Sequence, residues 1–329
     1  MNYRTLGKDL TVSTVGLGCM GMTHAYGPPA PEAKMKQLLH RAIGLGYTFF
    51  DTAECYTGKR RDGSIAYNEE LLGTALKPYR SKIVIATKFG VEHSPLGLKT
   101  DSIPETISKS VEGSLKRLDT EYIDLYYQHR IDPKIPIEDV AGTLADLIAE
   151  GKVRYWGMSE AGEEHIRKAH AVCPLTAVQN RYSMMYRDYD SLFPTLQELN
   201  IGYVAFSPLA NGILSDRYNK WSKFELGTDY RSFMPQYKAK AYEENKDLFA
   251  LLRGLAQEKN ATPAQISLAW MIAKHPNLVP IPGTTKSDRL AENAGAAEII
   301  LTAQEVADIE ESLDNMKMSA VFGGSKITK

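Results

Sequence analysis

The chain has 329 residues, of which 43% are hydrophobic and 24% are charged, and its formal net charge at pH 7 is −1. That length suits one large α/β barrel or two ordinary domains, and the near-neutral charge predicts no binding to nucleic acid or to a membrane surface. Cys19, Cys55 and Cys173 are too widely spaced for a disulfide framework or a zinc site. No apolar leader follows Met1 and no apolar run approaches transmembrane length, so we expect a cytoplasmic protein.

The first half of the chain alternates between strand and helix patterns. Residues 3–12 alternate weakly around Gly7-Lys8-Asp9, which predicts a β-hairpin. The predicted elements that follow are a strand over residues 13–17, a helix over 31–43, a strand ending at Asp51, a helix over 69–76, a strand ending at Lys88, a helix beginning at Pro104 and a strand over 123–127. Irregular loops are expected over 52–68 and between Lys88 and Pro104.

The same alternation continues through the second half. The predicted elements are helices over residues 139–149, 162–170, 190–199 and 287–294, strands over 152–158, 176–179, 202–206 and 278–281, and a last helix to Leu313 that opens on the capping box Thr302-x-x-Glu305. We expect the polar and aromatic segment 215–241 to cover the molecule rather than to be disordered, and the Gly/Ser-rich residues 319–329 to be mobile. No shift in composition marks a domain boundary.

This uninterrupted alternation favours a closed parallel barrel over an α+β arrangement. We therefore predict a (β/α)8 TIM barrel in one domain over residues 1–329, with an N-terminal β-hairpin and extra C-terminal helices. One competing pattern is Gly16-Leu-Gly18-Cys-Met-Gly21, which matches the G-x-G-x-x-G dinucleotide fingerprint. That fingerprint must open a helix, but prolines intervene here and the helix begins some ten residues late, so we interpret it as a tight loop.

Polar side chains stand at the ends of successive predicted strands. Asp51 ends one strand, Tyr56 follows on the next loop, Lys88 ends the next strand and His129 follows the one after. The separations of 37 positions (51 to 88) and 41 positions (88 to 129) each match one strand-plus-helix unit. We therefore expect these groups to meet on one rim of the barrel, where they could form a proton-transfer site.

These residues carry a family resemblance. Phe50-Asp51-Thr52-Ala53 with Tyr56, Ala86-Thr87-Lys88, and Asp124-Leu125-Tyr126 through His129 resemble the catalytic motifs of the aldo-keto reductases, and the resemblance runs from about Tyr3 to Asp314. The chain is most similar to the pyridoxal and perakine reductase-like branch and more distantly to potassium-channel β-subunits. The resemblance implies that the hairpin plugs the bottom of the barrel.

The four groups suit the reduction of a carbonyl compound. Hydride transfer builds negative charge on the carbonyl oxygen, so the site needs a proton donor. By resemblance, Tyr56 is the general acid, Lys88 lowers its pKa, Asp51 holds Lys88 in place and His129 orients the carbonyl. Nothing near Cys55 predicts a reactive thiolate.

The resemblance also implies NADPH or NADP+ as the cofactor. Ser159 and Gln179 would bind the nicotinamide carboxamide, and Phe206 would stack on the nicotinamide ring. Glu160 replaces the asparagine that is commoner in the family, which leaves its contact open. The remaining positions implied for the cofactor are Met20, then Ser207, Pro208, Leu209, Gly212, Leu214 and Arg217 around the pyrophosphate, and Gly283, Thr285, Lys286, Arg289, Glu292 and Asn293 around the adenosine.

The preference for NADPH over NADH is our expectation from the basic residues at the adenosine end. Lys286 and Arg289 cluster with Ser287 at a predicted helix N-terminus, which is a ready anion site. The planar fork of an arginine suits a phosphate ester.

The sequence thus predicts an NADPH-dependent reductase that converts aldehydes, and some ketones, to alcohols. An alternative is an NADPH-binding redox-sensing subunit with low turnover, like the channel β-subunits; His129 and the absence of an N-terminal extension favour an enzyme. A metal-dependent barrel hydrolase is disfavoured because Lys88 beside Asp51 would repel a cation. We expect a small-molecule carbonyl substrate, in a pocket lined by Met20, Met22, Tyr26, Phe89 and residues 215–241; the sequence predicts no oligomeric state.

Overall fold

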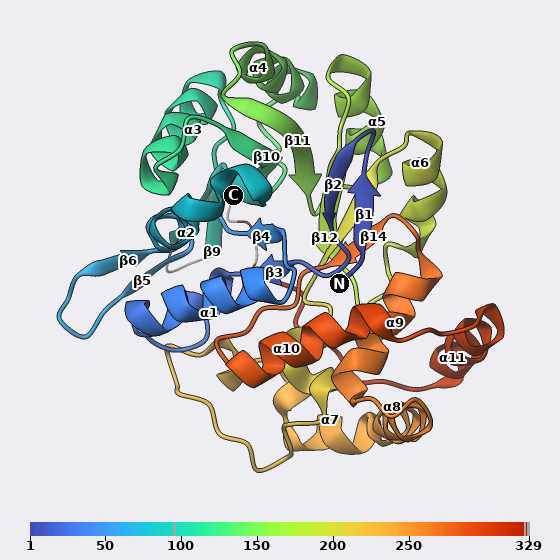
Figure 1. Ribbon diagram of the computed structural model, residues 1–329. Helices are drawn as coiled ribbons and strands as arrows, with labels where there is room; N and C mark the ends of the chain where they lie inside the picture. The colour runs from blue at the N-terminus through green and yellow to red at the C-terminus, as the bar shows by residue number, and fades with distance from the viewer. Residues whose placement is uncertain (95–96, 326, 328–329) are drawn as a thin grey trace.

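A computed structural model describes residues 1–94, 97–325 and 327 and has a parallel sheet at its centre (Figure 1). The strands are β3 (Leu17–Gly18), β4 (Phe49–Asp51), β7 (Val84–Phe89), β10 (Ile123–Gln128), β11 (Val153–Ser159), β12 (Ala177–Arg181), β13 (Gly202–Phe206) and β14 (Leu278–Pro280). They form an eight-stranded sheet in the order β14-β13-β12-β11-β10-β7-β4-β3. A parallel bridge between Gly18 and Gly283, with a 2.9 Å hydrogen bond from the Gly16 N–H to the Pro280 carbonyl, joins its two edges. The predicted (β/α)8 barrel is confirmed.

Helices surround the sheet (Figure 1). They are α1 (Glu32–Gly44), α2 (Asn68–Leu76), α3 (Pro104–Leu118), α4 (Ile137–Ala149), α5 (Glu163–Val172), α6 (Phe193–Glu198), α7 (Ala239–Glu244), α8 (Lys246–Glu258), α9 (Pro263–Lys274), α10 (Ser287–Gly295) and α11 (Ala303–Asn315). The long helices bury apolar stripes, most of them toward the strands, whereas α8 and α11 pack on α9. In α3, for example, Ile107, Val111 and Leu118 are buried, as their spacing predicts. No helix of the described residues is long and apolar enough to cross a lipid bilayer.

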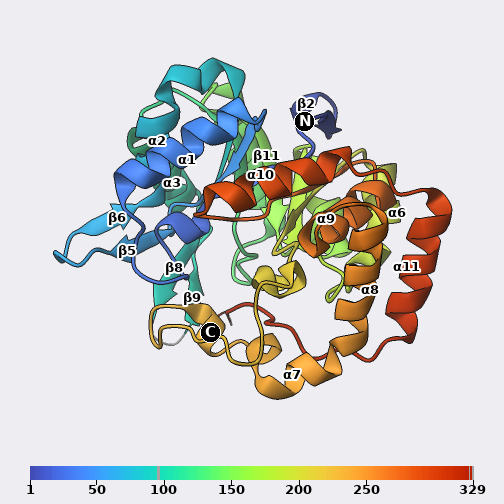
Figure 2. The ribbon, with the colours of Figure 1, turned by 60° about the horizontal axis from the view of Figure 1, so that its bottom comes forward.

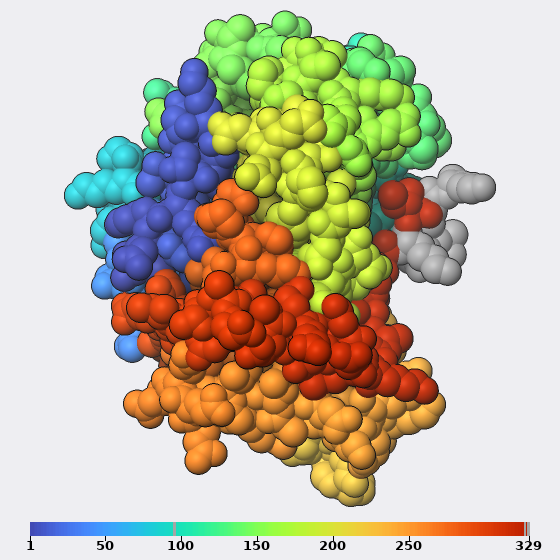
Figure 3. Space-filling view, turned by 90° about the vertical axis from the view of Figure 1, so that its right-hand side faces the viewer, coloured from blue at the N-terminus to red at the C-terminus, as the bar shows by residue number. Residues whose placement is uncertain are grey.

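The hairpin β1 (Tyr3–Leu6) and β2 (Leu10–Ser13) plugs one end of the barrel. Its Leu6 and Val12 join a cluster inside the barrel that includes Phe49, Leu125 and Val204. Contact is so close that a Cβ on Gly202 would lie 2.8 Å from the Leu6 Cβ. Figure 3 shows the N-terminal residues lying beside the yellow-green segment near residue 200. The opposite end is therefore the one left for a functional site.

Several predicted boundaries differ from the structure. The first barrel strand is Leu17–Gly18 rather than residues 13–17, because Ser13 pairs within the hairpin. The expected irregular loops hold two short hairpins, β5 (Thr57–Lys59) with β6 (Ile65–Tyr67), and β8 (Val91–Ser94) with β9 (Gly97–Thr100). These strands are short and largely exposed, so they carry no apolar alternation. The capping box of Thr302 and Glu305 is confirmed at the start of α11.

The segment 215–241 lies beside the C-terminal tail. It is built of short turns, and its Gln236 accepts a 3.0 Å hydrogen bond from the Phe322 N–H through Oε1. Asn245 and Ser319 exchange two further hydrogen bonds of 2.9 Å. Of the tail that we expect to be mobile, residues 326, 328 and 329 lie outside the described residues. Figure 2 shows the described tail and α7 at the end of the molecule opposite the N-terminal hairpin.

Candidate active site

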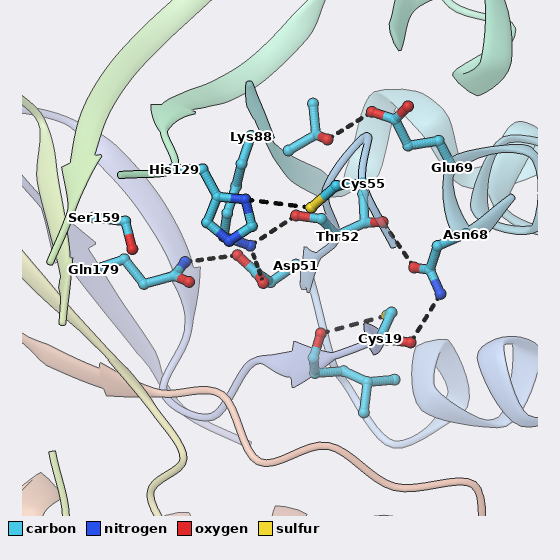
Figure 4. A network of polar contacts seen from close by, with 12 residues as sticks. Cys19, Asp51, Thr52, Cys55, Asn68, Glu69, Lys88, His129, Ser159 and Gln179 are labelled. Carbon is cyan, nitrogen blue, oxygen red and sulfur yellow. Dashed lines mark hydrogen bonds and ion pairs between the residues drawn. The ribbon is translucent and has the colours of Figure 1, made fainter. Parts of the chain in front are cut away.

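The C-terminal ends of neighbouring strands bring the predicted catalytic groups together. Asp51 ends β4, Lys88 lies near the end of β7, and His129 directly follows β10. Because β4, β7 and β10 are adjacent in the sheet, these side chains point toward one small region (Figure 4). The amide of Gln179 reaches the same region from β12. The spacing argument therefore placed the residues on the correct rim.

A buried ion pair forms the centre of this region. Lys88 Nζ donates to Asp51 Oδ1 at 2.5 Å and to the Thr52 carbonyl at 2.7 Å, and Gln179 Nε2 donates to Asp51 Oδ2 at 2.6 Å. Burial raises the pKa of Asp51, and the Lys88 ammonium and the Gln179 amide offset part of that rise. Both charges are almost fully shielded from water, so each depends on the other for stabilisation.

Tyr56 lies beside this pair, with Lys88 Nζ 5.1 Å from the centroid of its ring. The Lys88 ammonium by itself favours the phenolate form of Tyr56, as expected, but the pKa of Tyr56 is not lowered overall. Burial raises the pKa of Tyr56 well above its usual value, and the negative charge of Asp51 raises it further. The physical reason is that the ammonium is already bound to Asp51 and to the Thr52 carbonyl. The phenol is therefore protonated throughout the physiological range.

His129 meets Tyr56 edge to face, with the ring centroids 5.7 Å apart. Burial, together with the positive charges of Arg130 and Lys88, lowers the pKa of His129 well below its usual value. The imidazole is consequently neutral and keeps one N–H donor. Its Nδ1 lies 3.5 Å from Cys55 Sγ. Burial raises the pKa of Cys55 to about 12, so this group is a thiol, as expected.

A cavity of about 480 Å³ connects these groups to the cofactor positions implied by the resemblance. Asp51, Tyr56 and His129 line it, and Lys88 lies behind Asp51. The cofactor positions that also line it are Met20, Ser159, Gln179, Phe206, Ser207, Pro208, Leu209, Gly212, Gly283, Thr285, Lys286 and Arg289. This volume lies within the range usual for cofactor and substrate pockets.

Four of the implied cofactor positions do not line the cavity. Leu214 and Asn293 are buried in the packing around it. Arg217 Nη2 instead forms a 2.8 Å ion pair with Glu292 Oε2, and this pair joins the segment 215–241 to α10. Arg217 therefore contributes no free positive charge near the pyrophosphate positions.

The loop after β13 has an unusual backbone. Ser207, Ala210 and Asn211 have φ values of 50°, 47° and 61°, and Gly212 has 105°. Left-handed conformations cost a non-glycine residue about 1–2 kcal/mol each, and such strain is concentrated at functional sites. Successive N–H groups in left-handed turns form concave anion sites. At Gly212 a Cβ would press on the Tyr218 ring at 3.1 Å. The N–H groups of Ala210 and Gly212 donate to carbonyls within the loop, so a phosphate group would be met by the remaining N–H groups of this turn.

The far end of the cavity is basic. Lys286 caps α10, whose first N–H groups are free to bind an anion, and Arg289 in its first turn donates to the Tyr218 hydroxyl at 3.1 Å. Gly283 approaches Gly18 so closely that a Cβ there would lie 2.9 Å from the Gly18 carbonyl oxygen. Together with the strained loop, these donors fit a dinucleotide phosphate.

Sequence reasoning missed three arginines that line the cavity, namely Arg130, Arg181 and Arg231. Arg130 directly follows His129, and Arg181 lies two residues beyond Gln179 on the same strand. Because alternate residues of a strand face the same side, the position of Gln179 was a signal that could have revealed Arg181. Arg231, in the covering segment, carried no such signal.

Fold and site together define the class of protein: the chain belongs to the aldo/keto reductase family, whose model matches residues 14–314. It is thus an oxidoreductase of a family that generally uses nicotinamide cofactors. The chain is 42% identical over 309 residues to "Probable aldo-keto reductase 1" of Glycine max, which covers 93% of this chain and 87% of that protein.

Solved structures agree with this assignment. The glycerol dehydrogenase AKR11B4 of Gluconobacter oxydans matches with a TM-score of 0.84 at 26% identity, covering 95% of each chain. The thermostable aldo-keto reductase Tm1743, solved with the inhibitor epalrestat, matches with a TM-score of 0.75 at 30% identity, covering 95% of this chain and 100% of that one. The resemblance predicted from the motifs is confirmed.

Proposed function

We propose that this chain, acting as a single barrel domain over residues 1–329 in the cytoplasm, uses NADPH to reduce aldehydes and some ketones to alcohols. One observation carries the proposal. A buried Lys88–Asp51 ion pair lies beside Tyr56 in a cavity that continues to Lys286 and Arg289. The proposed proton donor and the proposed phosphate-binding residues therefore line one continuous cavity. The described residues contain no cluster of His, Cys, Asp or Glu that could hold a metal ion.

The chain's own residues can hold the cofactor by distinct groups. Gln179 Nε2 donates a hydrogen bond to Asp51, so Gln179 Oε1 remains available to accept one from the nicotinamide carboxamide. The hydroxyl of Ser159 accepts from Arg130 Nη1 at 3.2 Å and so can donate its own hydrogen. Phe206 would pack on the nicotinamide ring, and the loop that follows Phe206 would bind the pyrophosphate. Lys286 and Arg289 would bind the phosphate on the adenosine.

Bound NADPH would supply the hydride that reduces the carbonyl carbon. Tyr56 would give its phenol proton to the carbonyl oxygen as negative charge builds there. Because its raised pKa holds this proton firmly, transfer occurs only once the oxygen has become strongly basic. Lys88 then stabilises the phenolate that remains, and the neutral His129 donates its N–H to orient the oxygen.

The cofactor preference can be tested by removing the charges at the adenosine end. We expect the double variant Lys286→Ala/Arg289→Met to raise the KM for NADPH by about 10–100-fold, since charge-assisted hydrogen bonds to a phosphate would be lost. The KM for NADH should change by less than about threefold, because NADH lacks that phosphate. The measurement is steady-state oxidation of each cofactor with an aldehyde panel that includes pyridoxal, methylglyoxal and nitrobenzaldehyde.

The control removes a charge far from the cavity. Lys116→Met, on the exposed side of α3, should leave both KM values unchanged. Equal catalytic efficiencies with NADPH and NADH in the wild-type protein would refute the preference. Very slow turnover with tight retention of NADPH would favour the redox-sensing subunit instead.

The pH dependence of reduction follows from the two shifted groups. His129 stays neutral as the pH falls through 6.5, since its pKa lies well below that value, and Tyr56 stays protonated as the pH rises toward 10. We therefore expect kcat/KM for aldehyde reduction to vary by less than about threefold between about pH 6.5 and 9. Stopped-flow or steady-state rates across this range provide the measurement. The rates are also measured at about pH 5.5, where a histidine of ordinary pKa, about 6.5, would lower them about tenfold; such a decline would mean that His129 titrates normally.

A further inference from the structure

Two arginines near the nicotinamide end of the cavity have no part in the proposed hydride and proton transfers. Arg181 ends β12 and pairs in register with Phe206. Its side chain is only 4% exposed to solvent, yet it lines the cavity. Arg130 lines the cavity from the end of β10.

The guanidinium of Arg181 is poorly satisfied by the protein. Its nearest carboxylate is Glu160, with Nη2 3.6 Å from Oε2, and among the described residues it donates no hydrogen bond. The rings of Tyr186 and Phe206 lie 4.8 and 5.4 Å from it, which stabilises the charge but occupies none of its N–H donors. A buried guanidinium with five donors is normally held by a carboxylate or phosphate in planar, paired hydrogen bonds. Glu160 therefore balances part of the charge of Arg181, but the N–H donors of its guanidinium stay open to an anion inside the cavity.

Arg130 adds a second charge of the same sign. It donates to its neighbour's carbonyl, His129 O, at 2.6 Å and to Ser159 Oγ at 3.2 Å, and the described residues place no carboxylate in an ion pair with it. Its guanidinium lies 6.0 Å from the centroid of Phe206, the ring that Arg181 also approaches. The two arginines therefore border the same part of the cavity.

The rest of the cavity does not neutralise them. Among the described lining residues, Asp51 is the carboxylate, and it is already paired with Lys88. The third arginine, Arg231, differs because it is chelated by Asp229, with contacts of 2.6 and 2.9 Å. The cavity lining also includes the apolar residues Val91, Met234 and Phe322. Low polarity there strengthens any charge pairing with Arg130 and Arg181.

We propose that the substrate carries an anionic group, a carboxylate or a phosphate, which Arg181 and Arg130 bind while its carbonyl faces Tyr56. This inference rests on the proposed reduction of aldehydes and names its substrate class. Gln179 lies at the same height in the barrel as Asp51, to which it donates a hydrogen bond. Arg181 lies two residues further along the strand, about 7 Å nearer the C-terminal end of the barrel. The anionic group is therefore a few bonds from the carbonyl. The tail borders this place, since a Cβ on Gly324 would lie 2.9 Å from Arg181 Nη2.

Matched pairs of substrates test the proposal. Succinic semialdehyde is compared with butanal for the carboxylate, and glyceraldehyde 3-phosphate with glyceraldehyde for the phosphate. We expect kcat/KM to be at least about tenfold higher for the anionic member of one pair, as charge-assisted hydrogen bonds imply. The pair that shows the preference identifies the anionic group.

Variants of Arg181, Arg130 and Glu160 then show which residues cause this preference. Arg181→Met should lower the ratio of anionic to neutral kcat/KM by about 10–100-fold, and Arg181→Lys by less, because lysine lacks the planar fork. Glu160→Gln should raise the ratio by a few fold. The amide oxygen of the new glutamine still accepts a hydrogen bond from the backbone N–H of Arg181, but the side chain no longer carries a charge that competes with the substrate for the guanidinium. Arg130→Met provides a second variant should Arg181→Met fold poorly, as judged by its Tm.

The proposal is overturned if the ratio is near one in the wild-type protein, or if Arg181→Met and Arg130→Met change both members of a pair equally. The latter result would mean that the arginines serve packing alone. If no aldehyde is reduced, the proposed function fails, and calorimetry with succinate and inorganic phosphate decides the inference separately. Binding that Arg181→Met abolishes would still support an anion site, whereas no binding, or equal binding by both proteins, would exclude one.

Discussion

Replacing Tyr56 by phenylalanine is expected to lower kcat for aldehyde reduction by about 10²–10⁴-fold, because Tyr56 is the phenol that lines the cavity beside His129 and the Lys88–Asp51 pair. The variant keeps the ring that packs edge to face on His129. It should therefore bind NADPH within about twofold of the wild-type affinity. Single-turnover rates and fluorescence titration of NADPH measure the two quantities independently.

A matched control is Tyr126→Phe. Tyr126 is also buried, but its ring packs on Phe89 outside the cavity. The loss of the Tyr126 hydroxyl in this variant should leave kcat within about threefold of the wild-type value. If Tyr56→Phe kept full turnover, another group would have to supply the proton and the assignment of Tyr56 would be wrong.

Replacing Lys88 by methionine is expected to lower the free energy of unfolding by about 3–5 kcal/mol and to abolish most turnover, since the Asp51 carboxylate would be left buried without its partner. The double variant Lys88→Met/Asp51→Asn removes both charges and should recover much of the stability but none of the activity. Urea unfolding and aldehyde reduction measure the two effects. Lys152→Met is the control, because Lys152 pairs with Glu112 and Glu150 at the surface and its loss should leave the free energy of unfolding nearly unchanged.

The stability loss in Lys88→Met should depend on pH. Burial raises the pKa of Asp51, and the variant lacks the ammonium that offsets this rise. The folded variant then holds a proton on Asp51 that the unfolded chain releases above its ordinary pKa of about 4. Stability therefore declines as the pH rises, and the difference from the wild-type protein should be smaller at about pH 5 than at about pH 8. An equal loss at both pH values would contradict a buried, unpaired carboxylate.

The sequence predicted those features that depend on order along the chain. Asp51 and Lys88 lie at or near the ends of their strands and His129 directly follows its strand. Parallel strands bring their C-terminal ends to one rim, so spacing alone located these residues. The strand over residues 202–206 was placed without error because its apolar run is bounded by a glycine and a serine. The strands β5 and β6 were missed because strands of three residues give too little periodicity to detect.

Features that depend on burial or on distant partners could not be read in this way. The direction of the Tyr56 pKa follows from the balance between burial and a charge already engaged with Asp51, and neither is visible in a linear sequence. The partner of Arg217 is Glu292, 75 positions away. The same limit applies to Arg181, because its proposed role depends on the unoccupied N–H donors of its guanidinium, and a linear sequence does not show which donors are occupied.

The two ends of the chain differ in a way that matters for experiments. The N-terminus belongs to the hairpin that plugs the bottom of the barrel, whereas Phe322, Gly324 and Ser325 line the cavity itself. A purification tag or reporter fused after Lys329 would be separated by only four residues from Ser325, which lines the cavity. Fusions are therefore better placed before Met1, and kinetic data from C-terminally tagged protein should be compared with data from protein whose tag has been cleaved.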